Sequence, residues 1–275
     1  MSVLHHIDLS SGRLEYLWLG PPPAAAPTIV FLHEGLGSAK LWRSFPRALV
    51  GACPGWGALV YTRFGYAGSD PIALPRATTY HQPEAVEVLP ELLERLGVGE
   101  HLLIGHSDGA TIALMNGGLA PRPGLRGLIA LAPHVFVEEE TIAGIARTCS
   151  RYQPELRAKL ARHHGDKVDA VFRGWADTWL SPEFRDWNVE AVLPGITVPT
   201  LVIQGRQDEY ATLAQVERVV TGIGQRAEAL VIDACGHVPH QEQEQVVLKA
   251  MAGFIGRLAA KPAGGGRHEG RSGSS

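Results

Sequence analysis

The sequence is poor in cysteine and carries no excess of positive charge. Its three cysteines, Cys53, Cys149 and Cys235, are odd in number and far apart. We therefore expect free thiols in a reducing compartment rather than a disulfide framework. The formal net charge is −3 and no run of basic residues is present, which argues against a nucleic-acid partner.

Long apolar runs are also missing. No stretch reaches transmembrane length, and His5, His6 and Asp8 interrupt what would be an apolar segment at the N-terminus. We therefore expect a cytoplasmic protein without a membrane partner. The histidines do not have the spacing of metal ligands: His5-His6 and His163-His164 are adjacent pairs, which cannot share a helix face. No metal or other cofactor is expected, and the oligomeric state is left open.

Hydrophobic residues make up 45% of the 275 residues, enough for a substantial core. Their pattern predicts a β-hairpin over 3–9 and 13–19, and after it strands that alternate with helices. The expected strands lie at 28–32, 58–61, around 102–104, 125–132, 200–204 and 229–232. The expected helices lie at about 40–50, 81–96, from about 110, 212–222 and 240–259. This alternation is typical of βαβ units in a mostly parallel sheet, and so of the α/β class.

The alternation is interrupted once. Residues 136–195 contain no strand-like run and are expected to form a helical insertion in a core made of 1–135 and 196–260. The segment 261–275 is rich in Gly, Ser and Arg, and we expect it to be disordered. Within the helix expected at 81–96, Pro90 requires either a later start, near residue 88, or a kink.

The pentapeptide Gly105-His106-Ser107-Asp108-Gly109 lies between an apolar strand and an apolar helix. A strand that turns directly into a helix bends sharply, which strains the residue at the bend and exposes its side chain. The amide groups that open the helix favour negative charge nearby. This Gly-X-Ser-X-Gly context predicts that Ser107 is a nucleophile whose attack creates an oxyanion. The alternative is a glycine-rich turn with a solvated serine.

A serine nucleophile needs a base, and the base needs an orienting acid. Among twelve histidines, His237 follows the strand expected at 229–232, and Asp208 follows the strand at 200–204. The carboxyl ends of strands are where open α/β sheets place their sites. We call the sharp strand-to-helix turn at Ser107 the elbow. The chain order Ser107, Asp208, His237 is also the order expected when such an elbow lies in a hydrolase sheet. Asp208 could instead be a solvated turn residue.

Four motifs together make the chain resemble enzymes of the α/β-hydrolase fold over about residues 3–260. They are His33 to Gly37, Arg63 to Ser69, the elbow, and the Asp208 and His237 loops. The resemblance implies a mostly parallel sheet flanked by helices, with the 136–195 insertion as a helical cap between the sixth and seventh strands.

The resemblance also assigns the oxyanion hole to the backbone amides of Gly35 and Asp108. Glu34 stands where the family usually has a glycine. Glu138 is an alternative to Asp208, because some related enzymes carry the acid after the preceding strand. His33 and His106 are expected to make hydrogen bonds around the site.

These residues predict a serine hydrolase that cleaves a small carboxylic ester through an acyl-enzyme. Trp175, Trp179 and Val238 are candidate substrate contacts, although the two tryptophans could simply form the core of the cap. Enzymes of this fold that act on epoxides or haloalkanes use an aspartate nucleophile, and Ser107 at the elbow disfavours that chemistry.

Two other functions stay open. The first is a C–C bond hydrolase of a ring-cleavage dienoate or β-diketone. Such enzymes commonly have a tryptophan after the catalytic histidine, where this chain has Val238, and they need a cation for the dienoate carboxylate. Cap arginines could supply it: Arg147, Arg151, Arg157, Arg162, Arg173 and Arg185. The second is a binding protein that keeps the fold without turnover.

Overall fold

A computed structural model describes residues 3–259, so the tail expected to be disordered lies outside the described residues. Eight strands form one sheet in the order β1-β2-β4-β3-β5-β6-β7-β8. Their bounds are β1 Leu4–Leu9, β2 Gly12–Leu19, β3 Thr28–Leu32, β4 Gly57–Thr62, β5 His101–His106, β6 Leu125–Leu131, β7 Thr200–Gly205 and β8 Ala227–Ile232. The β1–β2 and β2–β4 pairs are antiparallel and all other pairs are parallel. The predicted mostly parallel α/β sheet is confirmed.

The helices follow the strands as the alternation requires. Their bounds are α1 Phe45–Ala52, α2 His81–Pro83, α3 Leu89–Arg95, α4 Asp108–Leu119, α5 Glu139–Ser150, α6 Arg157–His164, α7 Val168–Leu180, α8 Ala214–Ile223, α9 Pro239–Glu242 and α10 Glu244–Ala259. Short 3₁₀ turns lie at Ala39–Trp42, Gly165–Lys167, Pro182–Phe184, Glu190–Gly195 and Gly224–Arg226, and a wider π turn lies at Glu84–Val88. The segment Tyr152–Leu156 contains a kink at Gln153, whose backbone is extended at φ −104° and ψ 138°.

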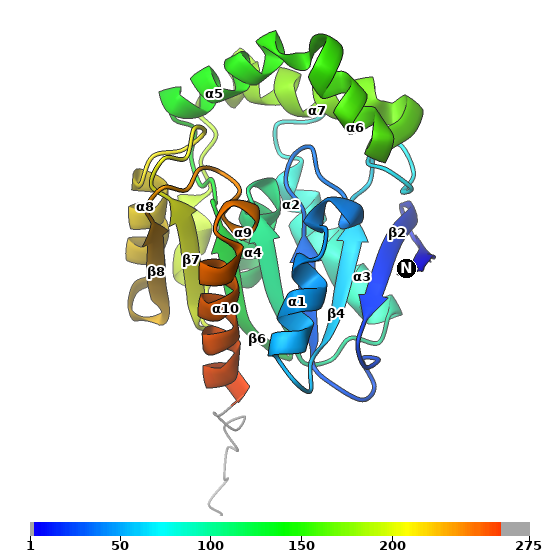
Figure 1. The fold of residues 1–275 in the computed structure, drawn as a ribbon, viewed down its shortest axis with the longest axis vertical. Coiled ribbons are helices and arrows are strands. Elements are labelled where there is room, and N and C mark those ends of the chain that lie inside the picture. Colours follow the sequence, from blue (N-terminus) through cyan, green and yellow to red (C-terminus); the bar gives the residue numbers. More distant parts are fainter. Residues whose placement is uncertain (1–2, 260–275) are drawn as a thin grey trace, which may run out of the picture.

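The central strands are apolar without interruption because both faces of the sheet are covered. Every residue of β3 is buried, and its alternate side chains enter two different cores. Val30 and Leu32 pack with side chains from α3, α4 and α8. Ile29 and Phe31 pack with side chains from α1 and α10, which lie together on the near face in Figure 1.

The helix predicted over 81–96 begins at His81 and stays helical past Pro90, so a start near residue 88 is wrong. Proline has no N–H and its ring crowds the carbonyl of the preceding turn. The chain widens into the π turn Glu84–Val88 just before the proline. The strain that the sequence predicts at Pro90 is met by this wider turn.

Helices α5, α6 and α7, which we call the cap, lie beyond the carboxyl ends of the strands and cover that end of the sheet (Figure 1). They occur between β6 and β7 and have a hydrophobic core of their own, which includes Ile145, Leu160, Phe172 and Trp179. No helix within residues 3–259 combines the length and the apolar character needed to cross a bilayer.

The 3₁₀ turn Glu190–Gly195, inside the segment predicted as the cap, packs on the core helices. A Cβ at Gly118 of α4 would overlap the Val192 carbonyl, and a Cβ at Gly222 of α8 would meet the Leu193 side chain at 2.7 Å. Leu193 itself belongs to the core cluster that contains Val30. We propose that the cap ends before this turn.

His164 at the end of α6 joins the cap to two core loops. Its Nε2 donates to the carbonyl of Leu36 at 2.9 Å, and its Nδ1 accepts the N–H of Ala67 at 3.2 Å. This pattern requires a neutral ring with the proton on Nε2. Burial lowers the pKa of His164 and so favours that neutral form.

Candidate active site

Ser107 occupies a strained turn between β5 and α4. Its backbone lies at φ 52° and ψ −120°, a left-handed conformation that non-glycine residues rarely adopt. A Cβ at Gly105 would overlap the carbonyl of Gly109, and a Cβ at Gly109 would overlap the carbonyl of Leu32. Both glycines are needed because strand and helix approach this closely, and the result is the sharp elbow that the pentapeptide predicts.

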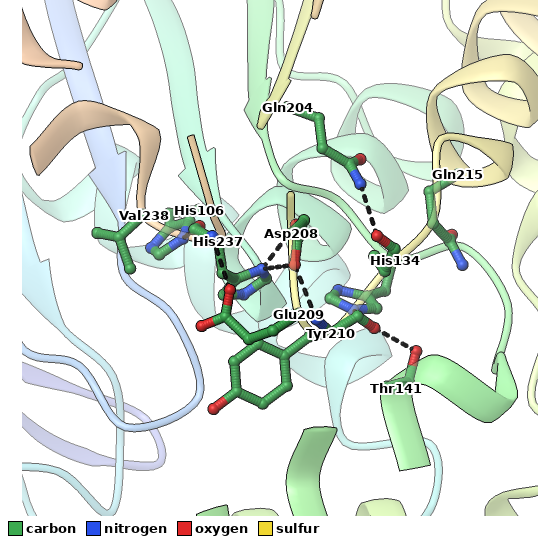
Figure 2. Close-up of polar contacts among 12 residues, drawn as sticks. His106, His134, Thr141, Gln204, Asp208, Glu209, Tyr210, Gln215, His237 and Val238 are labelled. Atoms are coloured by element: carbon green, nitrogen blue, oxygen red, sulfur yellow. Dashed lines mark hydrogen bonds and ion pairs between the residues drawn. The ribbon is translucent and has the colours of Figure 1, made fainter. Parts of the chain in front are cut away.

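His237 and Asp208 meet across the loops that follow β8 and β7 (Figure 2). Nδ1 of His237 lies 2.9 Å from each carboxylate oxygen of Asp208, whose side chain is fully buried. The carboxylate also accepts the N–H of Tyr210 at 2.9 Å. An ionised carboxylate can only accept, so Nδ1 carries the proton and Nε2 is left as a hydrogen-bond acceptor.

The pair shifts both pKa values toward the charged forms. Burial alone would lower the pKa of His237, but the charge and hydrogen bond of Asp208 raise it above its ordinary value. Burial would raise the pKa of Asp208, yet the charge and hydrogen bond of His237 bring it below its ordinary value. An imidazolium formed at His237 would therefore be stabilised by a carboxylate that is already ionised.

Glu138, the alternative acid, has other partners. It accepts hydrogen bonds from the N–H of Thr212 at 3.1 Å and from Nε2 of Gln215 at 2.8 Å. These contacts hold the start of α8 against the loop after β6. The carboxylate that the structure brings to the ring of His237 is that of Asp208, while Glu209 accepts only its backbone N–H.

A cavity of about 320 Å³ opens between the elbow and the cap. Its lining contains the predicted nucleophile, base, oxyanion donors and substrate contacts, which are Gly35, Ser107, Asp108, Trp175, Trp179, His237 and Val238, but neither Asp208 nor Glu138. The lining also contains residues that the sequence did not single out: Leu41, Arg43, His134, Thr141, Ile145, Glu209, Tyr210 and Gln241. A small or medium-sized molecule fits a cavity of this size.

The two predicted oxyanion donors come from the loop after β3, which contains Gly35, and from the start of α4. Asp108 is the first residue of α4, and the first amides of a helix have no acceptor within it. Gly35 lies under the cap, where an added Cβ would overlap the indole of Trp175. That contact explains why this position is glycine, which was not evident from the sequence.

The side chain of Asp108 is buried among polar groups, an arrangement that the sequence did not reveal. Its Oδ2 accepts the hydroxyl of Tyr80 at 2.7 Å and lies 3.4 Å from Nη2 of Arg63, and its Oδ1 lies 3.5 Å from Nε2 of His81. Burial would raise the pKa of this carboxyl, but His81, Arg63 and Tyr80 hold it well below its usual range. The Tyr80 hydroxyl also accepts Nε1 of Trp179 at 3.0 Å, which links the cap to the elbow.

Glu34 also faces the cavity. Its Oε2 lies 3.6 Å from Nδ1 of His106, and Nε2 of His106 donates to the carbonyl of His237 at 2.8 Å. Burial would raise the pKa of Glu34, but the hydrogen bond and charge of His106 lower it to about 2. His106 thus makes one hydrogen bond at the site, to the carbonyl of His237, as the sequence analysis expected.

His134 follows β6 and contributes a third imidazole to the cavity wall. Its ring centre lies 5.6 Å from that of His237. Burial and the charge of His237 lower its pKa to about 4, so it is neutral at neutral pH. Across residues 3–259, no three His, Cys, Asp or Glu side chains are grouped as ligands of a metal ion.

Similarity to known proteins extends over most of the chain. The model of the alpha/beta hydrolase family matches residues 29–250. A 2-hydroxy-6-oxononadienedioate/2-hydroxy-6-oxononatrienedioate hydrolase from Cupriavidus pinatubonensis (strain JMP 134 / LMG 1197) is 27% identical, over 85% of this chain and 88% of the relative. Epoxide hydrolase A of Mycobacterium tuberculosis (strain ATCC 25618 / H37Rv) is 25% identical, over 73% of this chain and 66% of the relative. The crystal structure of VinJ matches with a TM-score of 0.71 at 24% identity, over 94% of this chain and 99% of VinJ.

Proposed function

This chain belongs to the alpha/beta hydrolase family, and on that basis we propose that it is a serine hydrolase that cleaves a small carboxylic ester through an acyl-enzyme. One observation carries the proposal. The base His237 is oriented by Asp208 at 2.9 Å and shares a cavity with Ser107, whose strained turn presents it there. This is the arrangement that nucleophilic acyl transfer requires.

The first half of the reaction forms the acyl-enzyme. Nε2 of His237 takes the hydroxyl proton of Ser107 as Oγ attacks the carbonyl carbon, and the carbonyl electron pair moves to oxygen. The amides of Gly35 and Asp108 stabilise this oxyanion. The oxyanion then collapses, the C–O bond to the alcohol breaks, and His237 returns the proton to the leaving alkoxide.

The second half repeats these steps with water. His237 takes a proton from water, the hydroxide attacks the acyl carbon, and the second oxyanion occupies the same two amides. Its collapse releases the carboxylic acid and returns the proton to Oγ of Ser107. Asp208 stays ionised throughout and stabilises the imidazolium.

C–C bond hydrolysis is the second candidate, because the relative that is 27% identical is named as a hydrolase of an oxo-dienedioate. Such a substrate carries carboxylates that need cationic partners. Within residues 3–259 the cavity lining includes Arg43 from the core but none of the cap arginines. The cap contributes Thr141, Ile145, Trp175 and Trp179 instead, an apolar and aromatic wall that suits a neutral ester better.

Labelling by a fluorophosphonate probe tests the nucleophile. The wild-type protein should be labelled, and Ser107→Ala should keep the fold, lose the label and lose several orders of magnitude in kcat, because the triad acts as a unit. Retained turnover in the purified variant would refute the assignment.

The ratio of kcat/KM for a short-chain aryl ester and for a ring-cleavage dienoate tests the substrate class. Loss of the dienoate can be followed by its absorbance. We expect the ester to be preferred. A preference for the dienoate of about tenfold, or about 1.4 kcal/mol, would replace the ester proposal with C–C hydrolysis.

A further inference from the structure

The Arg63 to Ser69 motif follows β4 and has no role in the steps above. Arg63 is fully buried and contacts both the loop after β3 and the first residue of α4. Its Nη2 donates to the carbonyl of Glu34 at 2.9 Å and lies 3.4 Å from Oδ2 of Asp108. These two partners are the residues whose peptide groups set the proposed oxyanion donors.

The contact with Glu34 fixes the first donor. The carbonyl of Glu34 and the N–H of Gly35 belong to one peptide plane, and in a trans peptide they point in opposite directions. Arg63 holds that carbonyl at 2.9 Å, and Nδ1 of His33 donates to it at 2.7 Å. With the carbonyl held toward the buried side, the N–H is directed to the other side, where Gly35 lines the cavity.

His33 is itself set by the same arginine. Its Nε2 accepts the backbone N–H of Arg63 at 3.0 Å, so the ring is neutral with its proton on Nδ1. Burial and the charge of Arg63 lower the pKa of His33 to about 3, which keeps that donor in place at neutral pH. The main chain and the side chain of Arg63 thus act on one carbonyl.

The contact with Asp108 holds the second amide donor in place and also neutralises the charge of the Asp108 carboxylate. The Asp108 carboxylate is joined through its own Cα to the amide that would stabilise the oxyanion. An unpaired carboxylate so close would repel the negative charge that develops in the transition state. The guanidinium at 3.4 Å neutralises that charge while it holds the first turn of α4.

We propose that Arg63 is a positioning residue that aligns both amide donors of the oxyanion hole, through the Glu34 carbonyl and the Asp108 carboxylate. The inference rests on the proposed function. A buried ion pair is costly and is often replaceable by apolar side chains without loss of stability. Its use here is the placement of two backbone groups, which an apolar side chain cannot perform.

The test separates oxyanion stabilisation from ordinary binding by means of two ketones. An aryl trifluoromethyl ketone accepts Oγ of Ser107 at its carbonyl carbon, and the proton passes to His237, so the bound adduct carries an oxyanion. The matching methyl ketone has nearly the same shape but binds without forming that adduct. Inhibition constants for both are compared in wild type, Arg63→Met and Arg63→Lys, with kcat and KM for a short-chain aryl ester.

We expect Arg63→Met to lower kcat about 100-fold or more, as loss of an oxyanion donor does, with little change in KM. The affinity for the trifluoromethyl ketone should fall by a similar factor and that for the methyl ketone should hold. Arg63→Lys should recover part of the loss, because an ammonium keeps the charge and has three donors, but its side chain ends one bond short of the position of Nη2, which makes both contacts. A kcat close to wild type in Arg63→Met, or equal losses for both ketones, would overturn the proposal.

Two further variants serve as controls. Arg63→Met leaves the Asp108 carboxylate without its cationic partner and could unfold the protein. The double variant Arg63→Met/Asp108→Leu removes both charges, so its kcat tests the proposal. It should fold and keep the loss in kcat, because the Glu34 carbonyl still lacks its guanidinium donor and keeps only His33 and the N–H of Gly37; recovery of kcat would overturn the proposal. Arg76→Met is the matched control, because Arg76 and Arg63 both lie over the ring of Tyr66 and Arg76 donates to the Tyr66 hydroxyl at 2.9 Å. It should leave the ratio of the two ketone affinities unchanged.

The same experiments distinguish this inference from the proposed function. If Ser107→Ala still turns over the ester, the proposed nucleophile fails whatever Arg63 does. If Ser107→Ala is inactive while Arg63→Met retains wild-type kcat, the hydrolase proposal stands and the role of Arg63 is refuted.

Discussion

Replacing Asp208 by asparagine changes the group that orients the base His237, while the size of the side chain stays nearly the same. The carboxylate lies 2.9 Å from Nδ1 of His237 through both of its oxygens. An asparagine amide can donate to Nδ1, which would move the imidazole proton to Nε2. His237 could then no longer accept the proton of Ser107.

The size of the loss follows from the geometry. Two unit charges 2.9 Å apart attract by about 6 kcal/mol at an effective dielectric constant of about 20. Each 1.36 kcal/mol corresponds to tenfold in rate, so losing the stabilised imidazolium should lower kcat by about 10⁴-fold, as the wrong tautomer also predicts. Steady-state hydrolysis of a short-chain aryl ester measures it, and the melting temperature shows whether the variant is folded.

Glu138→Gln is the control for this experiment. The glutamine can still accept the N–H of Thr212 through its carbonyl oxygen, and Glu138 has its partners at α8 rather than at His237. Its kcat should stay near that of wild type. A large loss in Glu138→Gln together with a small one in Asp208→Asn would move the acid to Glu138 and refute the reasoning.

Two further predictions follow from the geometry of the site. Because the base must be neutral and the pKa of His237 is raised, kcat/KM should increase with pH, and the midpoint of this increase should lie above the ordinary pKa of histidine. In Asp208→Asn the midpoint should fall. An unchanged midpoint would mean that another group titrates. Gly35→Ala should lower both kcat and the melting temperature, because the added Cβ overlaps the indole of Trp175. A Gly35→Ala variant with wild-type kcat and melting temperature would show that the cap does not pack on this loop.

Much of the fold was predictable because its signals are local in sequence. The buried run Thr28 to Leu32 and the strand before Ser107 are apolar on both faces, as strands of a covered parallel sheet must be. The strained turn at Ser107 follows from small residues on either side of it. The proximity of Asp208 and His237 follows from chain order and from the shared edge where parallel strands end.

The polar environment behind the site was not predictable, because its partners are distant in sequence. Asp108 pairs with Arg63 and Tyr80, which come from the loops after β4 and before α2. Nothing in a single sequence tells a buried carboxylate from a solvated one at the first turn of a helix. The contact of Glu34 with His106 likewise depends on how two loops pack, although the unusual residue at position 34 was visible.

The cap of this protein makes specific contacts with the loops of the core beneath it. His164 bonds the carbonyl of Leu36 and the amide of Ala67 with one ring, and the indole of Trp175 occupies the space that any Cβ at Gly35 would need. A cap transplanted from a relative would have to bring both groups in the same places or leave the loop that carries Gly35 without these two contacts. Cap and loop therefore have to change together, so engineering new specificity by exchanging helices requires moving this loop along with them.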